Sequence, residues 1–181
     1  MKRKTARKNQ AVLRDKEICS DILHYGEGIL QSKEFQHASA ETHHLRGNVA
    51  EHTLTVCILA ARICRTLQKH GITVNEKDLI QAALCHDLGM LGRDTAYKNR
   101  TDSWKSHPEK SASVARELVP DLSTNAESMI TTHMWPVSGP HPRSREAMIL
   151  NLADKWASAA DWVCFLTGKQ VGADIREDLL P

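Results

Sequence analysis

The sequence contains no apolar run that approaches the roughly 20 residues needed to cross a bilayer, and no secretory signal follows the N-terminus. It also lacks a glycine-rich phosphate loop, a Ser-His-Asp order, a Cys-x-x-Cys pair and any internal repeat. The cysteines are odd in number and lie among apolar residues, so we interpret them as reduced core residues: Cys19, Cys57, Cys64, Cys85 and Cys164. These absences predict a cytoplasmic protein without a membrane segment.

Length and charge indicate one globular domain. The chain has 181 residues, of which 41% are hydrophobic and 25% are charged, as is usual for a domain that buries a core. Five of its 24 basic residues lie in the first ten positions, without an acidic one, so the rest of the chain is net acidic. We therefore expect a basic, disordered tail over residues 1–13 and a single domain over 14–181. Neither nucleic acid nor a membrane is an expected partner.

The spacing of apolar residues follows the helical period along most of the chain, and no segment has the alternation of a strand. Helices are predicted over residues 15–31, 49–70, 75–89, 107–119, 123–135 and 145–167. Asn48 with Glu51 is an N-cap signal, and Gly71 ends the same helix. Ser106 and Glu109 form a capping box, which predicts His107 at the start of its helix. The fold class is all-α, with about six to eight helices.

Imidazoles and carboxylates recur in this helical chain in an order typical of a metal site: His52, His86, Asp87, His107, His133 and Asp154. Divalent transition metals bind imidazole nitrogen and carboxylate oxygen readily. Asp87 follows the apolar run 82–85, where an unpaired buried carboxylate would cost several kcal/mol, and a metal would neutralise it. Asp154 in its apolar helix poses the same problem, for which an ion pair with Lys155 or an arginine is the alternative. Cys85 is interpreted as a packing residue near the site.

Two segments predicted to be irregular, 90–105 and 135–144, follow these candidate ligands and should border the site. They contain Trp104 and Trp135, which could stack a base, and cations that suit a phosphate: Arg93, Lys98, Arg100, Lys105 and Arg143. The alternative for each of these residues is a solvated polar loop.

Three motifs together resemble the HD-domain metal-dependent phosphohydrolases. They are Asn-Val-Ala-Glu-His ending at His52, His-Asp-Leu-Gly beginning at His86, and Leu-Ala-Asp-Lys around Asp154, and the resemblance covers roughly residues 45 to 160. It implies a helical bundle around a metal held by His52, His86, Asp87 and Asp154.

His107 in Ser-His-Pro-Glu-Lys-Ser-Ala and His133 in Thr-Thr-His-Met resemble two further histidines of the binuclear branch of that family. The branch includes cyclic-dinucleotide phosphodiesterases and diadenosine tetraphosphate hydrolases, and it implies that Asp87 bridges two metals. Met90 stands where many members have a phosphate-contacting lysine and others a glutamate, so no general acid is identified. The His-His-Glu and Gly-Tyr-Pro signatures of the cyclic-dinucleotide enzymes are missing, which disfavours that substrate.

The expected function is hydrolysis of a phosphate ester or anhydride of a nucleotide or other small phosphorylated metabolite by metal-activated water. Asp87 and His86 are the expected catalytic residues, and the metals are two divalent ions of iron, manganese, zinc, nickel or cobalt. The candidate substrate contacts are His44, Arg93, Lys110 and Arg143. Two alternatives stay open: a di-iron oxygenase on the same ligands, and a metal-stabilised nucleotide-binding sensor. The helix exteriors show no heptad seam that would predict an oligomeric state.

Overall fold

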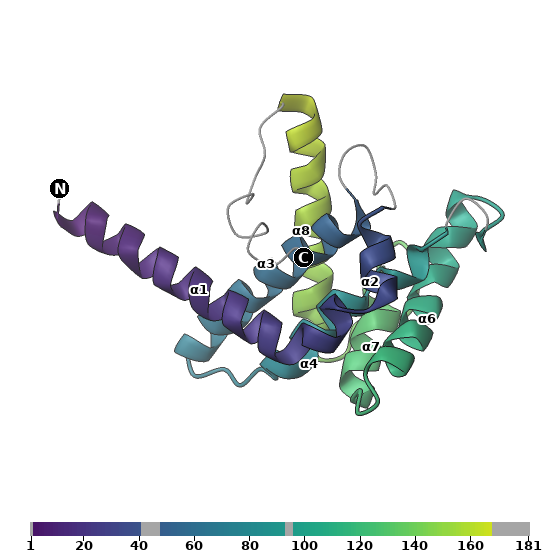
Figure 1. Ribbon diagram of the computed structural model, residues 1–181, viewed down its shortest axis with the longest axis horizontal. Helices are drawn as coiled ribbons and strands as arrows, with labels where there is room; N and C mark the ends of the chain where they lie inside the picture. Colours follow the sequence, from purple (N-terminus) through teal and green to yellow (C-terminus); the bar gives the residue numbers. More distant parts are fainter. Residues whose placement is uncertain (1, 41–47, 93–95, 168–181) are drawn as a thin grey trace.

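The protein forms a helical bundle in the computed structural model, which describes residues 2–40, 48–92 and 96–167, with only the backbone of 2–14, 100 and 161–167. Figure 1 shows the arrangement. Within the described ranges there are seven α-helices, one 3₁₀ turn and no strand, as the all-α prediction expected. The elements are α1 (Lys2–Leu30), α2 (Lys33–Ala38), α3 (Val49–Lys69), α4 (Glu76–Cys85), η1 (Leu88–Met90), α6 (Arg100–Leu118), α7 (Thr124–Thr132) and α8 (Arg145–Thr167).

Polar side chains cap the helices that carry the candidate ligands. The side-chain oxygen Oδ1 of Asn48 accepts from the Glu51 amide at 2.8 Å at the start of α3, and Gly71, with φ +75°, follows the helix end. Asn75 begins α4 and Ser123 begins α7 in the same way. The observed bounds confirm those predicted for α3, α7 and α8 within a few residues. The short helix α2, capped by Ser32, was not predicted.

The predicted start of α6 was wrong. The helix begins at Arg100 after an Asn99 cap, so Pro108 and His107 lie well inside it and Trp104 is on a helix rather than in a loop. Proline has no N–H to donate to the carbonyl four residues earlier, which is that of Trp104. The Ser138 hydroxyl donates to this carbonyl at 2.7 Å instead. Ser138, in the loop after α7, thus satisfies the Trp104 carbonyl that the proline leaves open.

The helices enclose one core. α3 packs against α4 and α8, α7 packs against α4, α6 and α8, and η1 packs against α6. The largest fully buried side chains include Phe35, Leu54, Leu79, Leu84, Met129 and Leu150. Cys57, Cys64 and Cys85 are buried free cysteines, and burial raises the pKa of the Cys85 thiol to about 12, so that thiol is neutral. The elements that bear the candidate ligands therefore meet at the centre of the bundle.

Arg65 on α3 joins α1 to this bundle. Its guanidinium contacts Asp21 and Glu17 of α1 and Glu76 of α4. Farther toward the N-terminus, α1 extends away from the other helices (Figure 1) and includes residues 2–13, for which the sequence predicts a disordered tail. The division into tail and domain stays a prediction.

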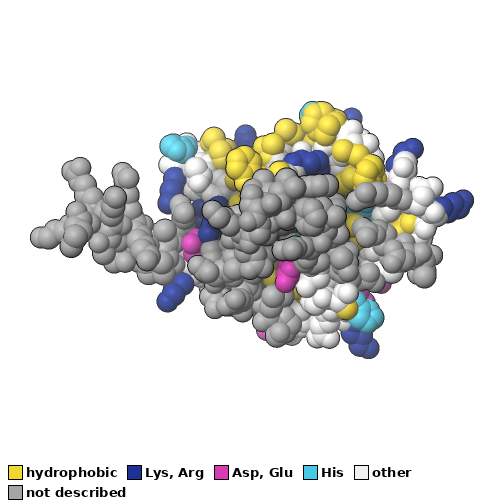
Figure 2. All heavy atoms as spheres, turned by 90° about the horizontal axis from the view of Figure 1, so that it is seen from above, with side chains coloured by type: hydrophobic (Ala, Val, Ile, Leu, Met, Phe, Trp, Pro, Cys, Tyr) yellow, Lys and Arg dark blue, Asp and Glu magenta, His cyan; other side chains and the backbone are white. Residues whose placement is uncertain are grey.

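No helix among the described residues is both long and apolar enough to span a membrane. On the face seen in Figure 2, the described Lys and Arg side chains are scattered around the periphery and do not form one patch.

Candidate metal centre

All six predicted ligands come together, although they lie in or beside six different helical elements. His52 is in the first turn of α3, His86 caps the C-terminus of α4, and Asp87 precedes η1. His107 lies inside α6, His133 caps the C-terminus of α7, and Asp154 lies within α8. The six residues are between 0% and 6% exposed. A fold that buries four imidazoles and two carboxylates in one place must satisfy them there.

The two oxygens of Asp87 face different histidines. Oδ1 lies 3.3 Å from His107 Nε2 and 3.5 Å from His133 Nε2. Oδ2 lies 3.5 Å from His86 Nε2 and 3.9 Å from His52 Nε2. The carboxylate therefore stands between two groups of nitrogen donors, with one oxygen toward each.

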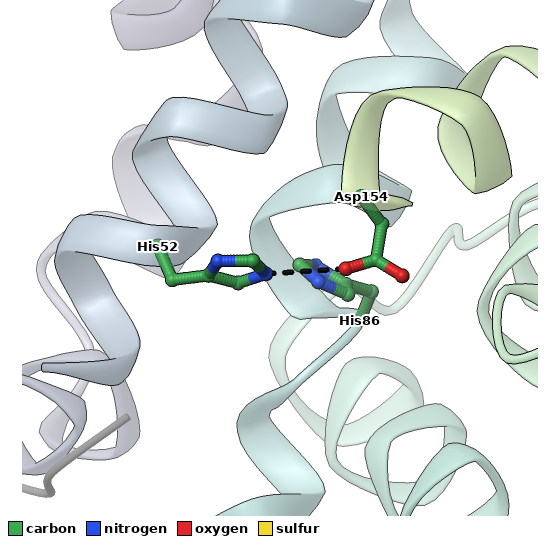
Figure 3. A group of neighbouring side chains, drawn as sticks. All are labelled: His52, His86 and Asp154. Atoms are coloured by element: carbon green, nitrogen blue, oxygen red, sulfur yellow. Dashed lines mark hydrogen bonds and ion pairs between the residues drawn. The ribbon is translucent and has the colours of Figure 1, made fainter. Parts of the chain in front are cut away.

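His52 and Asp154 complete the group on the Oδ2 side. His52 Nε2 lies 3.2 Å from Asp154 Oδ1, and the ring of His86 lies beside this pair (Figure 3). Ligand atoms of His52, His86 and Asp154 lie within 4.8 Å of one another, as do those of His86, Asp87 and His133. Each set could hold a metal ion.

Backbone carbonyls fix the orientation of three of the imidazoles. Nδ1 of His86 lies 2.8 Å from the Ala83 oxygen, and Nδ1 of His107 and of His133 has a carbonyl at 2.8 and 2.7 Å. A carbonyl only accepts, so Nδ1 carries the proton and the Nε2 of a neutral ring has a free lone pair. This arrangement directs metal-binding histidines. His86 Nε2 is also a buried atom without a hydrogen-bond partner in the part of the chain described.

The spacing between donor atoms tests whether a metal fits. The Nε2 atoms of His107 and His133 are 3.0 Å apart, although both rings have their Nδ1 proton on a carbonyl. Two lone pairs facing each other at this distance repel unless a cation or a proton lies between them. Donors bound at about 2.1 Å to one ion, with an angle of 90° to 110°, stand roughly 3.0 to 3.4 Å apart. The donor set and its spacing therefore fit a divalent metal.

The pKa shifts of His86 and Asp154 also favour the protonation states that a metal site needs. Burial lowers the pKa of His86 from 6.5 to about 4, despite the opposing charges of Asp87 and Asp154, so the ring is neutral at pH 7. Burial would raise the pKa of Asp154, but the hydrogen bond from His52 and the charge of Lys155 outweigh it and hold this pKa below its usual range. A neutral imidazole beside an ionised carboxylate is the protonation state that a metal requires.

Lys155 and Asn151 on α8 border the site, and the motif analysis did not assign either to it. Lys155 Nζ donates to Asp154 Oδ2 at 2.8 Å, so the ion pair considered as the alternative for Asp154 is present together with the His52 contact. Lys155 and Asn151 both donate to the His133 carbonyl. In the sequence, Lys155 is signalled by its place directly after Asp154, and Asn151 by its spacing of one helical turn from Lys155.

Gly89 is the point where the turn after Asp87 meets α6. A Cβ atom there would lie 2.5 Å from both the His107 carbonyl oxygen and the Ser111 nitrogen. The Gly89 amide donates to the Ser111 hydroxyl at 2.9 Å, and the Tyr97 hydroxyl donates to the Gly89 carbonyl. Only glycine permits this approach, which brings Asp87 and His107 into register.

Two of the four predicted substrate contacts lie among the described residues, and all four stay predictions. His44 and Arg93 lie outside the described residues. The Lys110 ammonium donates to the Ala96 carbonyl at 3.2 Å and lies 3.7 Å from the centre of the Tyr97 ring, while Arg143 is exposed before α8. Met90, which replaces the family's charged residue, is 7% exposed.

The two tryptophans predicted to stack a base differ in their surroundings. Trp104 is 37% exposed on α6, and the half-buried Trp135 makes an edge contact with the His141 ring, their centres 4.6 Å apart.

The fold and the site thus define an all-α protein with a buried His/Asp cluster compatible with divalent metals. The HD-domain family model matches residues 49–159, so the chain belongs to the HD-domain family, within the superfamily of metal-dependent phosphohydrolases. A solved structure described as a conserved hypothetical protein from Pyrococcus furiosus is similar, with a TM-score of 0.50 and 16% identity over 88% of this chain and 89% of that chain. It supports the fold alone. No curated protein matches the chain.

Proposed function

We propose that the protein hydrolyses a phosphate ester or anhydride of a nucleotide or other small phosphorylated metabolite at a centre of two divalent metals. The observation that carries this proposal is the position of Asp87, whose two oxygens face two separate groups of histidines. One metal would be held by His52, His86, Asp154 and Asp87 Oδ2. The other would be held by His107, His133 and Asp87 Oδ1.

When bound, the two cations would lower the pKa of a water molecule and bind the phosphoryl oxygens. The protein's own part is to keep the donors in the required protonation state. Burial keeps His86 neutral, and the backbone carbonyls of Ala83, Ser103 and Ile130 hold the Nδ1 protons so that the Nε2 lone pairs point inward. Arg143 and Lys110 are the described cations proposed to contact the substrate, and the latter would have to leave Ala96 to do so.

The test combines metal analysis with a phosphate-release screen. Protein purified without added metal is assayed for iron, manganese, zinc, nickel and cobalt, and then for phosphate release from nucleotides, dinucleotides and simple monoesters with each metal. About two metals per chain and release from one class of compound are expected. One metal or none, with no release under any condition, would refute the binuclear hydrolase.

The two alternatives give different results in the same experiment. A di-iron oxygenase would consume oxygen with iron and would be inactive with zinc. A nucleotide sensor would bind nucleotide tightly and release no phosphate with any metal.

A further inference from the structure

The C-terminal end of α7, which carries His133, is held by two side chains of α8. The carbonyl oxygen of His133 accepts from Asn151 Nδ2 at 2.7 Å and from Lys155 Nζ at 2.9 Å. Asn151 also donates to the Trp135 carbonyl at 2.6 Å. The last carbonyls of a helix have no partner within the helix, and a cation near them is favourable. Asn151 and Lys155 therefore supply hydrogen-bond donors to a carbonyl at the end of α7 that has no partner within the helix.

Lys155 contacts a second predicted ligand at the same time. Its ammonium donates to Asp154 Oδ2 at 2.8 Å, which leaves Asp154 Oδ1 facing His52 at 3.2 Å. Asp154 belongs to the group on the Oδ2 side of Asp87, whereas His133 belongs to the group on the Oδ1 side. One ammonium thus touches both halves of the centre without being a donor to a metal.

We propose that Asn151 and Lys155 are positioning residues that set the geometry of both metal sites together, an inference that rests on the proposed metal centre. Lys155 fixes the rotation of the Asp154 carboxylate. Asn151 and Lys155 fix the last turn of α7, and the His133 ring follows that turn because its Nδ1 donates to the carbonyl of Ile130.

The chain offers a matched control for this role. Lys77 Nζ lies 2.8 Å from Asp121 Oδ2, the same separation as in the Lys155 and Asp154 pair, and neither residue belongs to the centre. Lys77→Met therefore removes a lysine-carboxylate pair of equal length while leaving the centre unchanged. Lys155→Arg keeps the positive charge and the donors, and Lys155→Met removes both.

The experiment is a cobalt titration of the metal-free full chain, followed by the visible absorption of bound Co²⁺, which reports ligand geometry, and by metal analysis. We expect Lys155→Met to raise the dissociation constants of both sites by about 10- to 100-fold and to change the absorption spectrum. Lys155→Arg keeps the charge on a longer, planar group, so it should recover part of the loss in both constants. Lys77→Met should match wild type.

Constants for Lys155→Met within twofold of wild type, with an unchanged spectrum, would overturn the proposal. So would weakening of one site alone, because the role assigned to Lys155 spans both. If Lys155→Met does not fold, as judged by circular dichroism, Lys155→Gln is titrated with the same criteria. A wild-type protein that binds no cobalt would instead refute the proposed function, so the two failures are distinguishable.

Discussion

Gly89→Ala should damage both the fold and the metal centre, because there is no space for a methyl group. The added Cβ would lie 2.5 Å from the His107 oxygen and the Ser111 nitrogen, whereas ordinary contact begins near 3.4 Å. Both obstacles are backbone atoms of α6, so relief requires η1 and α6 to separate by about 0.9 Å, the difference between these distances. The 2.9 Å hydrogen bond from the Gly89 amide to Ser111 would lengthen accordingly.

The cost follows from these contacts. Overpacking a tight interior typically destabilises by roughly 1–3 kcal/mol, and loss of the hydrogen bond adds about 1 kcal/mol. The same separation would move His107 away from Asp87, from which it now stands 3.3 Å. Cobalt affinity on the His107 side should therefore fall together with stability.

Urea unfolding of the metal-free protein and cobalt titration measure the two effects. Gly28→Ala is the matched control, because a Cβ at Gly28 meets nothing within 4 Å and the residue lies in α1. That control should be neutral or should stabilise by up to about 1 kcal/mol. A Gly89→Ala protein within about 0.5 kcal/mol of wild type, with unchanged cobalt binding, would refute this reasoning.

Three further predictions concern the ligands and the fold. Asp87→Asn removes the charge between the two groups of histidines. Metal content should therefore fall from two to one or none per chain, and phosphate release should fall by more than about 100-fold. Two metals with full activity would contradict the bridging role. The metal-free protein should lose up to roughly 3 kcal/mol of unfolding free energy as the pH falls from 6.5 to 4, because unfolded histidine takes up a proton while native His86 stays neutral. Above pH 6.5 this contribution is constant. In urea titrations at several pH values, His86→Gln should lack this pH dependence of the unfolding free energy. An equal slope against pH in both proteins would assign the dependence to other groups than His86. Arg65→Met should lower the free energy of unfolding in urea by about 1–2 kcal/mol because it loses three carboxylate partners. The control Arg116→Met loses only the exposed pair with Glu127 and should stay within about 0.5 kcal/mol of wild type. Equal losses would show that the Arg65 cluster contributes no more than a surface ion pair.

Local sequence patterns were sufficient for most of the helices. Asn48, Asn75 and Ser123 cap α3, α4 and α7 because each side chain reaches an amide only three residues away, an interaction that no distant residue has to supply. The start of α6 was predicted wrongly because the capping box of Ser106 and Glu109 indicated a later start, whereas the Asn99 side chain caps the helix. Ser138, which is distant in sequence, satisfies the Trp104 carbonyl that Pro108 leaves open within the longer helix.

The six predicted ligands were recognisable in sequence by their order and by the family resemblance, and for Asp87 and Asp154 also because a carboxylate in an apolar run needs a partner, whatever the fold. That requirement does not say which group partners which. Three features join residues from different helices. The two Asp87 oxygens face different histidines, and Gly89 approaches α6 so closely that a Cβ would lie 2.5 Å from its backbone. Asn151 and Lys155 of α8 donate to the carbonyl at the end of α7. Sequence by itself determined the helical class and most helix bounds, since these depend on neighbours along the chain, and its separated motifs indicated the candidate ligand set. The tertiary structure alone decided how the ligands are grouped and what holds them, because those contacts form only when α3, α4, α6, α7 and α8 pack around one point.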